Sequence, residues 1–543
     1  MNAISPPIPL IPENAPFSPA QRAWLNGFLA GLYGGASNTG LHGGAGTAGM
    51  SVASPLSAEP EDFPWHDPAL ELDERMRLAE GRPLQQQLMA AMGQLDCGQC
   101  GYLCHSYAAA LSEGRETSAS LCVPGARPTA RLLKQLLAEA PPAAAGAPAA
   151  ARVISAVSAA PQSVAAVAPA AVTAPTGRAV RVLSAAALTR SGSSKDVRHV
   201  VIDLAESGLS YEPGDSIGLA TPNDPSLVEA TLAALGASGE EHVPCPDGAT
   251  RPVRAAFTRY LDIARPLDRT TDLLAMSAKF PRHAEALRKL SEGADGTEPA
   301  DADLLDLLDA FPSARPPLAD LAASLPGLRP RLYSIASSLR ASRGQVNLCV
   351  AVVRDMRRGR LRCGVGSGFL ADRAASAGTV DAYIQPSHFR LPRDPAVPVI
   401  MVGPGTGIAP FRAFLAERAA AGIRGRAWLM FGERNRATDF LYEDELAAWH
   451  KDGTLSRLDT AFSRDQRRKI YVQDRMAENA EVLWRWLQDG AHFYVCGDAT
   501  RMAKDVDTAL RRLAMTEGRL SEHQARDWIV ALARQGRYLR DIY

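Results

Sequence analysis

A glycine-rich turn between an apolar run and a helical pattern constrains this chain more than any other feature. Residues 398–402 read PVIMV, which is typical of a buried parallel strand, and residues 403–407 read GPGTG. Glycines in such a turn let backbone N–H groups approach a pyrophosphate, because no side chain intervenes. Apolar residues then recur at helical spacing over 408–418. The pattern predicts a dinucleotide-binding loop that includes Gly405 and Thr406, with a tight strand-to-helix turn as the alternative.

Length and charge narrow the class of protein. The 543 residues are 46% hydrophobic and 22% charged, enough for about three domains with their own cores. Equal numbers of basic and acidic side chains, 59 of each, indicate neither nucleic acid nor an anionic membrane as a partner. The chain has no apolar run of about 18 residues, and its N-terminus lacks the regions of a secretory signal. We therefore expect a soluble cytoplasmic protein.

Two stretches of biased composition divide the N-terminal part. A tail over 1–33 carries an amphipathic helical pattern at 16–33, and a linker over 34–80 begins with a segment rich in Gly, Ala, Ser and Thr. A second linker, 136–177, is almost entirely Ala, Pro and Val from 140 onward. Such a segment cannot bury enough surface to fold alone, so we interpret both linkers as tethers.

Four of the eight cysteines lie within residues 81–135: Cys97, Cys100, Cys104 and Cys122. A triplet within eight residues can wrap one side of a cluster if the backbone folds tightly, and a distant cysteine followed shortly by proline completes four ligands. This spacing predicts a [4Fe-4S] domain in a reducing compartment. Zinc is the alternative, although zinc sites usually present two paired cysteine knuckles, and a structural site is the third reading.

Residues 178–394 combine strand patterns with helical ones. Residues 179–183 and 197–204 alternate as half-buried strands, whereas 223–324 is largely helical. These patterns predict a small antiparallel β-barrel with a helical insertion, followed over 395–543 by a doubly wound parallel nucleotide-binding sheet. The expected fold class is thus multidomain α/β, with a small iron–sulfur domain at the N-terminal side.

A basic loop follows the strand pattern at 455–460. It reads SRDQRRK from Ser463 to Lys469. A dianionic 2'-phosphate is best bound by a planar donor fork and a point charge, which Arg464 and Lys469 supply. The loop therefore predicts that NADPH is preferred to NADH, and a solvated basic loop without a ligand is the alternative.

Ordered motifs from Arg178 to Tyr543 resemble the diflavin reductase family. They include YEPGDSIGLATPND, RPRLYSIASS, VGPGTGIAPFRAFLAERAA, AFSRDQRRKIYVQD, FYVCGDATRMAKDV and RYLRDIY. Within that family the resemblance is greatest to the flavoprotein component of NADPH-sulfite reductase. The FMN domain of the family is missing here. In its place stand the four cysteines, which are similar to a small iron–sulfur domain of electron-transfer subunits, with one gap a residue shorter.

The resemblance implies roles for individual residues. The residues implied to bind FAD are Arg331, Leu332, Tyr333, Ser334, Cys349, Val350, Ala351, Gly364, Val365, Gly366, Ser367 and Tyr543. Those implied to bind NADPH are Ser463, Arg464, Lys469, Tyr471, Gln473 and Asp505, beside Gly405 and Thr406 of the glycine loop. The trio implied to support hydride transfer is Ser334, Cys496 and Asp541. Arg331 is expected on the pyrophosphate, Tyr333 along the isoalloxazine, and Tyr543 stacked on the flavin ring.

The expected function is an NADPH-dependent FAD reductase that passes single electrons through the [4Fe-4S] cluster to an acceptor protein. The resemblance implies that this partner is the haemoprotein subunit of a sulfite reductase. One alternative is a reductase that supplies a ferredoxin, a flavodoxin or a nitrite or nitrate reductase. Another is an FAD reductase whose cysteines form a zinc-bound docking module.

Overall fold

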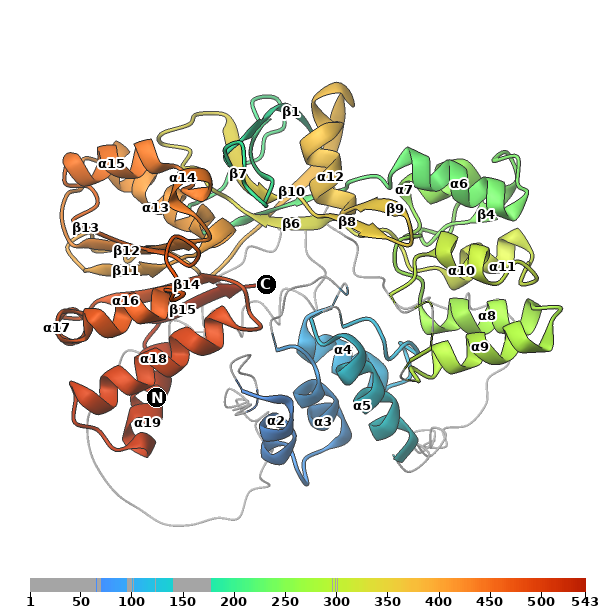
Figure 1. Ribbon diagram of the computed structural model, residues 1–543, viewed down its shortest axis with the longest axis horizontal. Helices are drawn as coiled ribbons and strands as arrows, with labels where there is room; N and C mark the ends of the chain where they lie inside the picture. Colours follow the sequence, from blue (N-terminus) through green and yellow to red (C-terminus); the bar gives the residue numbers. More distant parts are fainter. Residues whose placement is uncertain are drawn as a thin grey trace, which may run out of the picture. The chain divides into compact units, whose positions relative to one another are not determined.

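The structure is a computed structural model, and it describes residues 65, 70–94, 100, 102–122, 124–139, 177–294, 296, 297, 299 and 301–543 (Figure 1). The predicted N-terminal helix at 16–33, the alanine-rich stretch at 140–176 and Cys97 lie outside these residues. No helix in the described ranges is both long and apolar enough to cross a membrane.

A small group of helices lies at the N-terminal side of the described chain. Its helices are α2 (Leu72–Leu78), α3 (Leu84–Ala91), α4 (Cys104–Ser112) and α5 (Ala126–Glu139). Leu88, Tyr107 and Leu133 are fully buried in the core that α3, α4 and α5 share. Helix α2 falls within the range 34–80 that we predicted as linker, and the buried Trp65, packed with Ala79 and Ala90 near its end, explains why this short segment is ordered.

A six-stranded antiparallel sheet follows, in the order β6-β3-β10-β1-β2-β7. Its strands are β1 (Arg178–Ala187), β2 (Val197–Asp203), β3 (Ser216–Leu219), β6 (Arg331–Ser334), β7 (Gln345–Ala351) and β10 (Thr379–Gln385). The antiparallel prediction is confirmed, but the closed barrel is not. Edge strand β6 has only four residues, and just one isolated bridge, Ile335 to Leu348, joins its end to β7.

Two additions to this sheet matter for the site. A hairpin of β8 (Arg354–Arg357) and β9 (Arg360–Cys363) leads into α12 (Val365–Asp372) and the short η1 (Ala374–Ser376). The other addition enters between β3 and β6, which pair directly, so it is an insertion. It comprises α6 (Pro225–Leu235), β4 (His242–Pro244), β5 (Thr250–Pro252), α7 (Val253–Arg259), α8 (Asp268–Ser277), α9 (Pro281–Ser291), α10 (Leu304–Ala310) and α11 (Leu318–Ser324).

The C-terminal sheet is entirely parallel, in the order β13-β12-β11-β14-β15, which confirms the parallel prediction. Its strands are β11 (Val399–Val402), β12 (Ala427–Glu433), β13 (Arg457–Phe462), β14 (His492–Gly497) and β15 (Tyr538–Ile542). Its helical elements are η2 (Gly405–Ile408), α13 (Ala409–Ala420), α14 (Arg436–Asp439), α15 (Glu443–Lys451), α16 (Val472–Glu478), α17 (Ala480–Gln488), α18 (Met502–Thr516) and α19 (Glu522–Arg534).

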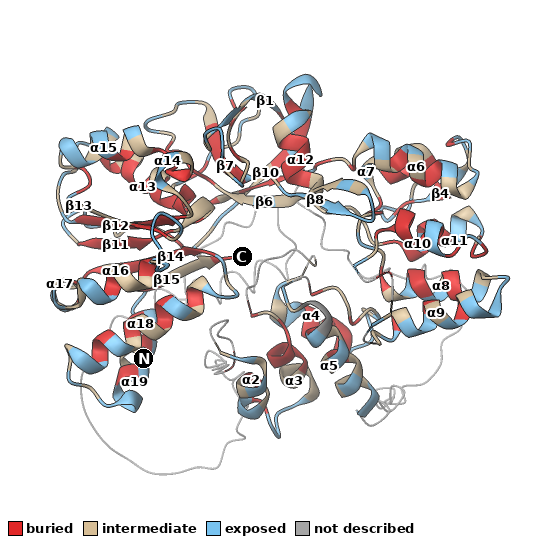
Figure 2. Ribbon diagram, in the orientation of Figure 1, coloured by how far each residue is buried: buried red, intermediate tan, exposed pale blue. Residues whose placement is uncertain are grey.

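Alternate residues of the central strands face two different cores. Met401 packs with Phe411 and Phe414 of α13, whereas Ile400 belongs to the core that includes Leu510 of α18. Figure 2 shows β11 and β12 as buried strands between exposed helix surfaces. Burial on both faces is the physical reason that these strands read as continuous apolar runs.

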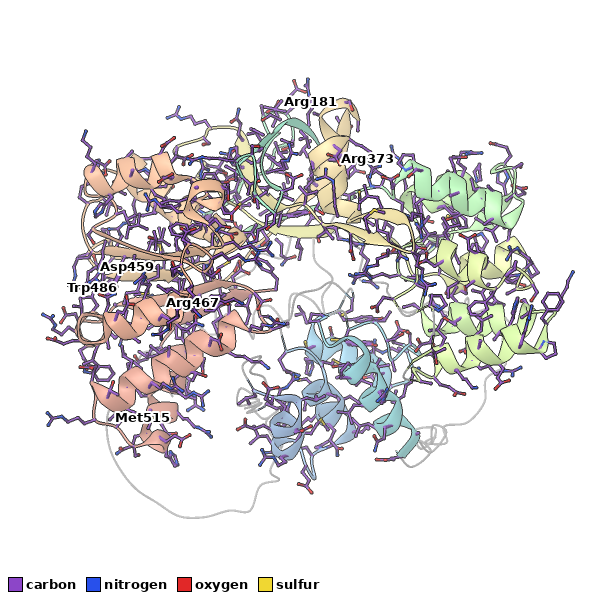
Figure 3. All side chains as sticks on the ribbon, viewed as in Figure 1. Arg181, Arg373, Asp459, Arg467, Trp486 and Met515 are labelled. Atoms are coloured by element: carbon purple, nitrogen blue, oxygen red, sulfur yellow. The ribbon has the colours of Figure 1, made fainter. Side chains whose placement is uncertain are left out.

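Trp428, a fully buried residue of the core that includes Leu510, shows how a polar atom is accommodated there. Trp428 Nε1 donates to Asp459 at 2.6 Å, and Trp486 packs edge-on against the same ring. Figure 3 labels Asp459 and Trp486 near each other in this domain. The aromatic body is therefore buried while its N–H keeps a partner.

Candidate active site

The glycine loop lies directly against the end of β14. Gly405 has a φ of 59°, a conformation that favours glycine. A Cβ on Gly407 would lie 2.1 Å from the carbonyl oxygen of Cys496, so no side chain fits there. Thr406 Oγ1 lies 2.8 Å from the Tyr543 hydroxyl. The loop is thus fixed at the carboxyl end of a parallel sheet, where nucleotide-binding crevices form.

The three residues predicted for hydride transfer come together at this end of the sheet. Cys496 and Asp541 are opposite each other in the β14–β15 ladder. Ser334 Oγ donates to Asp541 Oδ2 at 2.6 Å, and Cys496 Sγ donates to the same oxygen at 3.7 Å. Asp541 Oδ2, in the parallel sheet, therefore accepts hydrogen bonds both from Ser334 of the antiparallel sheet and from Cys496 of its own sheet.

Burial sets the protonation of this group. It raises the pKa of Cys496 well above its usual range, and the neighbouring Asp541 charge raises it further. Burial also raises the pKa of Asp541, partly opposed by the bonds that its carboxylate accepts from Ser334 and Cys496. Cys496 is consequently a neutral thiol at neutral pH, suited to contact and hydrogen bonding rather than to nucleophilic attack.

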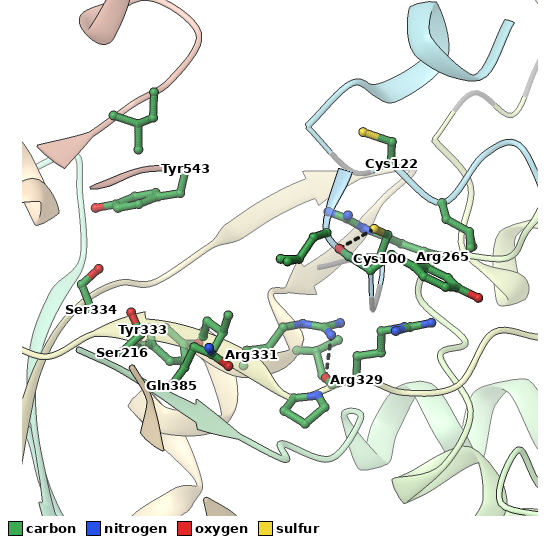
Figure 4. Close-up of a pocket in the computed structure, with 18 of the residues that line it drawn as sticks. Cys100, Cys122, Ser216, Arg265, Arg329, Arg331, Tyr333, Ser334, Gln385 and Tyr543 are labelled. Carbon is green, nitrogen blue, oxygen red and sulfur yellow. Dashed lines mark hydrogen bonds between the residues drawn. The ribbon is translucent and has the colours of Figure 1, made fainter. Parts of the chain in front are cut away.

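All twelve residues predicted to bind FAD line one pocket. Figure 4 labels four of them, Arg331, Tyr333, Ser334 and Tyr543. Tyr333, Ser334 and Tyr543 surround the same part of it, and burial raises the pKa of Tyr333 to about 12. Arg331 donates to the Arg329 carbonyl oxygen at 2.7 Å and pairs with Asp262 at 3.2 Å. These contacts hold the Arg331 guanidinium of β6 at the wall of the pocket.

The start of α12 supplies the second wall. A Cβ on Gly366 would lie 2.4 Å from the Tyr333 hydroxyl, so this position has to be glycine for the helix to approach β6. Ser367 Oγ accepts from Val353 N at 3.1 Å, which fixes the first turn. A helix N-terminus and a guanidinium on one pocket form a donor set that fits a pyrophosphate, as FAD binding requires.

The residues predicted to select NADPH lie in and after the loop that follows β13. Arg464 and Lys469 are exposed, and Tyr471, 44% exposed, is the N-cap residue of α16. Gln473 Nε2 donates to Asp505 Oδ2 at 3.1 Å, which brings two of the predicted residues into contact. Exposed cations and an exposed aromatic ring are the residue types suited to a phosphate and an adenine, respectively.

Lys195, in the β1–β2 loop, is a residue at this site that sequence reasoning missed. It forms an ion pair with Glu433, whose side chain is 1% exposed, and its Nζ would lie 3.9 Å from a Cβ on Gly405. The antiparallel domain therefore places a cation beside the nucleotide loop. The segment SGSSKD carries no local pattern that could have indicated this, because the contact depends on how the two sheets pack.

Three of the four predicted metal ligands are described, and they line one small apolar pocket. Cys100, Cys104 and Cys122 share it with Tyr102, Tyr107 and other residues. Gly93 N donates to Cys122 Sγ at 3.4 Å, and Cys100 Sγ donates to the Tyr102 carbonyl oxygen at 3.4 Å. Among the described residues, no group of three or more His, Cys, Asp or Glu side chains is arranged to hold a metal ion.

Comparisons with known proteins match the two sheets. Residues 174–369 match the FAD binding domain, and residues 401–508 match the oxidoreductase NAD-binding domain. Relatives include the sulfite reductase [NADPH] flavoprotein alpha-component of Vibrio cholerae, 40% identical over 368 residues, 66% of this chain and 58% of the relative. The protein of the same name from Neisseria meningitidis is 39% identical over 383 residues, 68% of this chain and 62% of the relative. The chain therefore spans about three fifths of these relatives' length.

Proposed function

We propose that the protein is an NADPH-dependent flavoprotein oxidoreductase that passes electrons on through its cysteine domain. The oxidoreductase activity is supported by the contacts of the Asp541 carboxylate. It accepts a hydrogen bond from Ser334 Oγ of the FAD-binding sheet and another from Cys496 Sγ of the NAD-binding sheet. Such a group lies where a flavin from one domain and a nicotinamide from the other have to meet. The names of the relatives support NADPH as the donor.

Each set of residues then has a defined task. Arg331 and the α12 N-terminus would hold the FAD pyrophosphate, and Tyr333 and Tyr543 would contact the flavin ring. Arg464 and Lys469 bind the 2'-phosphate, and the glycine loop accepts the coenzyme pyrophosphate. When bound, FAD supplies the ability to accept a hydride and to release electrons singly.

Ser334, Cys496 and Asp541 lie together where hydride transfer is proposed. Ser334 donates to Asp541 and is thereby oriented, and the neutral Cys496 thiol presents a small polarizable surface to the nicotinamide side. The buried carboxylate stabilises positive charge that develops on a nicotinamide as its hydride leaves.

The cysteine domain is proposed to hold a [4Fe-4S] cluster through Cys97, Cys100, Cys104 and Cys122. Support comes from the apolar pocket that the three described cysteines share and from the Gly93 N–H bonded to the Cys122 sulfur. A thiolate-lined apolar pocket with an N–H···S bond suits an iron–sulfur cluster. A cluster held by these cysteines would supply one-electron transfer.

The proposed acceptor is the haemoprotein subunit of a sulfite reductase, by analogy with the relatives' name. A ferredoxin, a flavodoxin or a nitrite or nitrate reductase is the alternative acceptor.

The test is cofactor analysis of the purified chain and of a Cys100→Ser variant. We expect FAD and iron with acid-labile sulfide, and visible absorbance beyond the flavin bands that bleaches under dithionite. Cys100→Ser is expected to lose iron but to keep FAD and NADPH–ferricyanide activity. The matched control is Cys245→Ser, a buried cysteine of the insertion, which is expected to keep both. Stoichiometric zinc without iron would contradict the electron relay and would support the alternative that the cysteines form a zinc-bound docking module.

A further inference from the structure

The loop with Ser463 and Arg464 is fixed to the neighbouring strand by its backbone. Ser463 N donates to the Glu433 carbonyl oxygen at 2.8 Å, and Arg464 N donates to the Arg434 carbonyl oxygen at 2.8 Å. These bonds continue the β12–β13 ladder beyond its last strand residues. The position of the Arg464 backbone therefore depends on the connection between β12 and α14.

The Asp465 side chain adds a second attachment to the same connection. Its carboxylate accepts from Arg436 N at 3.0 Å and from Asn435 Nδ2 at 3.2 Å. Asn435 N in turn donates to Asp439 Oδ2 at 3.0 Å, and Asp439 is buried. The Asp465 carboxylate thus anchors the exposed loop to the segment 435–439, and the buried side chain of Asp439 in turn holds that segment to the domain.

An acidic residue in this loop is unfavourable for phosphate binding by charge alone. The segment from Ser463 to Lys469 carries four cations and a single anion, Asp465, which directly follows Arg464. A carboxylate near a dianionic phosphate repels it, unless the carboxylate improves the site in another way. Its bonds to the Arg436 backbone N–H and to the Asn435 side-chain amide provide such an improvement, because they tie the loop to the connection between β12 and α14.

We propose that Asp465 is a positioning residue for coenzyme selection, which holds the loop so that Ser463 and Arg464 meet the 2'-phosphate of NADPH. The inference rests on the proposed NADPH pocket. Bidentate recognition by a guanidinium depends on orientation, so a loosened loop has to be ordered again on every binding event. NADH has no 2'-phosphate, and its binding does not use this orientation.

The test compares Asp465→Ala and Asp465→Asn with the wild type, using both coenzymes and ferricyanide as acceptor. Asp465→Ala is expected to raise the NADPH KM about five- to twenty-fold, with kcat, NADH kinetics and FAD content unchanged. Asp465→Asn keeps one acceptor for Arg436 N, so it should recover most of the NADPH affinity. Arg464→Ala serves as the positive control, and Asp444→Ala, an exposed carboxylate of α15, as the negative control.

Two results would overturn the inference. One is an Asp465→Ala NADPH KM close to that of the wild type while Arg464→Ala raises it, in which case the pocket stands and the positioning role does not. The other is an equal loss with both coenzymes or a loss of FAD, which marks Asp465 as part of the scaffold only. If Arg464→Ala also leaves the NADPH KM unchanged, the proposed coenzyme pocket fails as well.

Discussion

At the scale of single residues, the proposed hydride transfer centres on the Asp541 carboxylate and its two hydrogen-bond donors. Resemblance predicted the trio of Ser334, Cys496 and Asp541, and the structure brings all three to one oxygen. Lys195 could not be predicted in the same way, because its pairing with Glu433 joins segments 238 residues apart and leaves no local pattern. Residues that act through tertiary packing are visible only once the fold is known.

Asp541→Asn tests this carboxylate at the same scale. Losing a charge-assisted hydrogen bond costs about 1.5 to 3 kcal/mol, so flavin reduction by NADPH should slow about ten- to hundred-fold. The raised pKa of Asp541 also predicts a pH dependence of the rate of flavin reduction. The carboxylate is ionised above that pKa and becomes protonated as the pH falls through it. The wild-type rate should therefore decline at a higher pH than an ordinary Asp would give, whereas the Asn variant should not show that decline. Anaerobic stopped-flow reduction between pH 5 and 8 measures both; a wild-type rate and profile in the variant would remove Asp541 from the mechanism.

At the scale of elements, apolar continuity predicted the parallel sheet, because strands buried on both faces have no polar side. The closed barrel that we predicted was not found, since closure requires the distant edge strands β6 and β7 to pair, and a single isolated bridge, Ile335 to Leu348, joins them. Helix α2 was missed because a single tryptophan outside the helix, Trp65, completes its packing.

Gly407→Ala tests the junction between the glycine loop and β14. A Cβ there meets the Cys496 carbonyl oxygen at 2.1 Å, so backbone has to move. Such overpacking costs about 1 to 3 kcal/mol in unfolding free energy, and it should raise the KM of NADPH and NADH alike. Gly422→Ala is the control, because Gly422 has a φ of 72° with open space around it and so changes stability alone. Steady-state kinetics and urea unfolding distinguish the two variants, and unaltered coenzyme affinity in Gly407→Ala would disprove the close fit.

At the scale of the whole molecule, the two sheets share one apolar core. Val197 and Cys349 of the antiparallel sheet pack in the same cluster as Phe411 and Phe414 of α13. Hydride transfer between cofactors held by different domains requires such a rigid relation, since a displacement of about 1 Å can cost a hundredfold in rate. The sequence indicated both domains, but the contact that aligns them could not be derived from either pattern alone.

The most direct test measures electron transfer from NADPH to the proposed acceptor, a sulfite reductase haemoprotein, in parallel with transfer to ferricyanide, for the wild type and Cys100→Ser. We predict that the variant keeps its ferricyanide activity, because this acceptor takes electrons from reduced flavin directly. Its transfer to the haemoprotein should fall to near background, with reduced flavin accumulating. A Cys100→Ser protein that reduces the haemoprotein at the wild-type rate would contradict the relay through the cysteine domain.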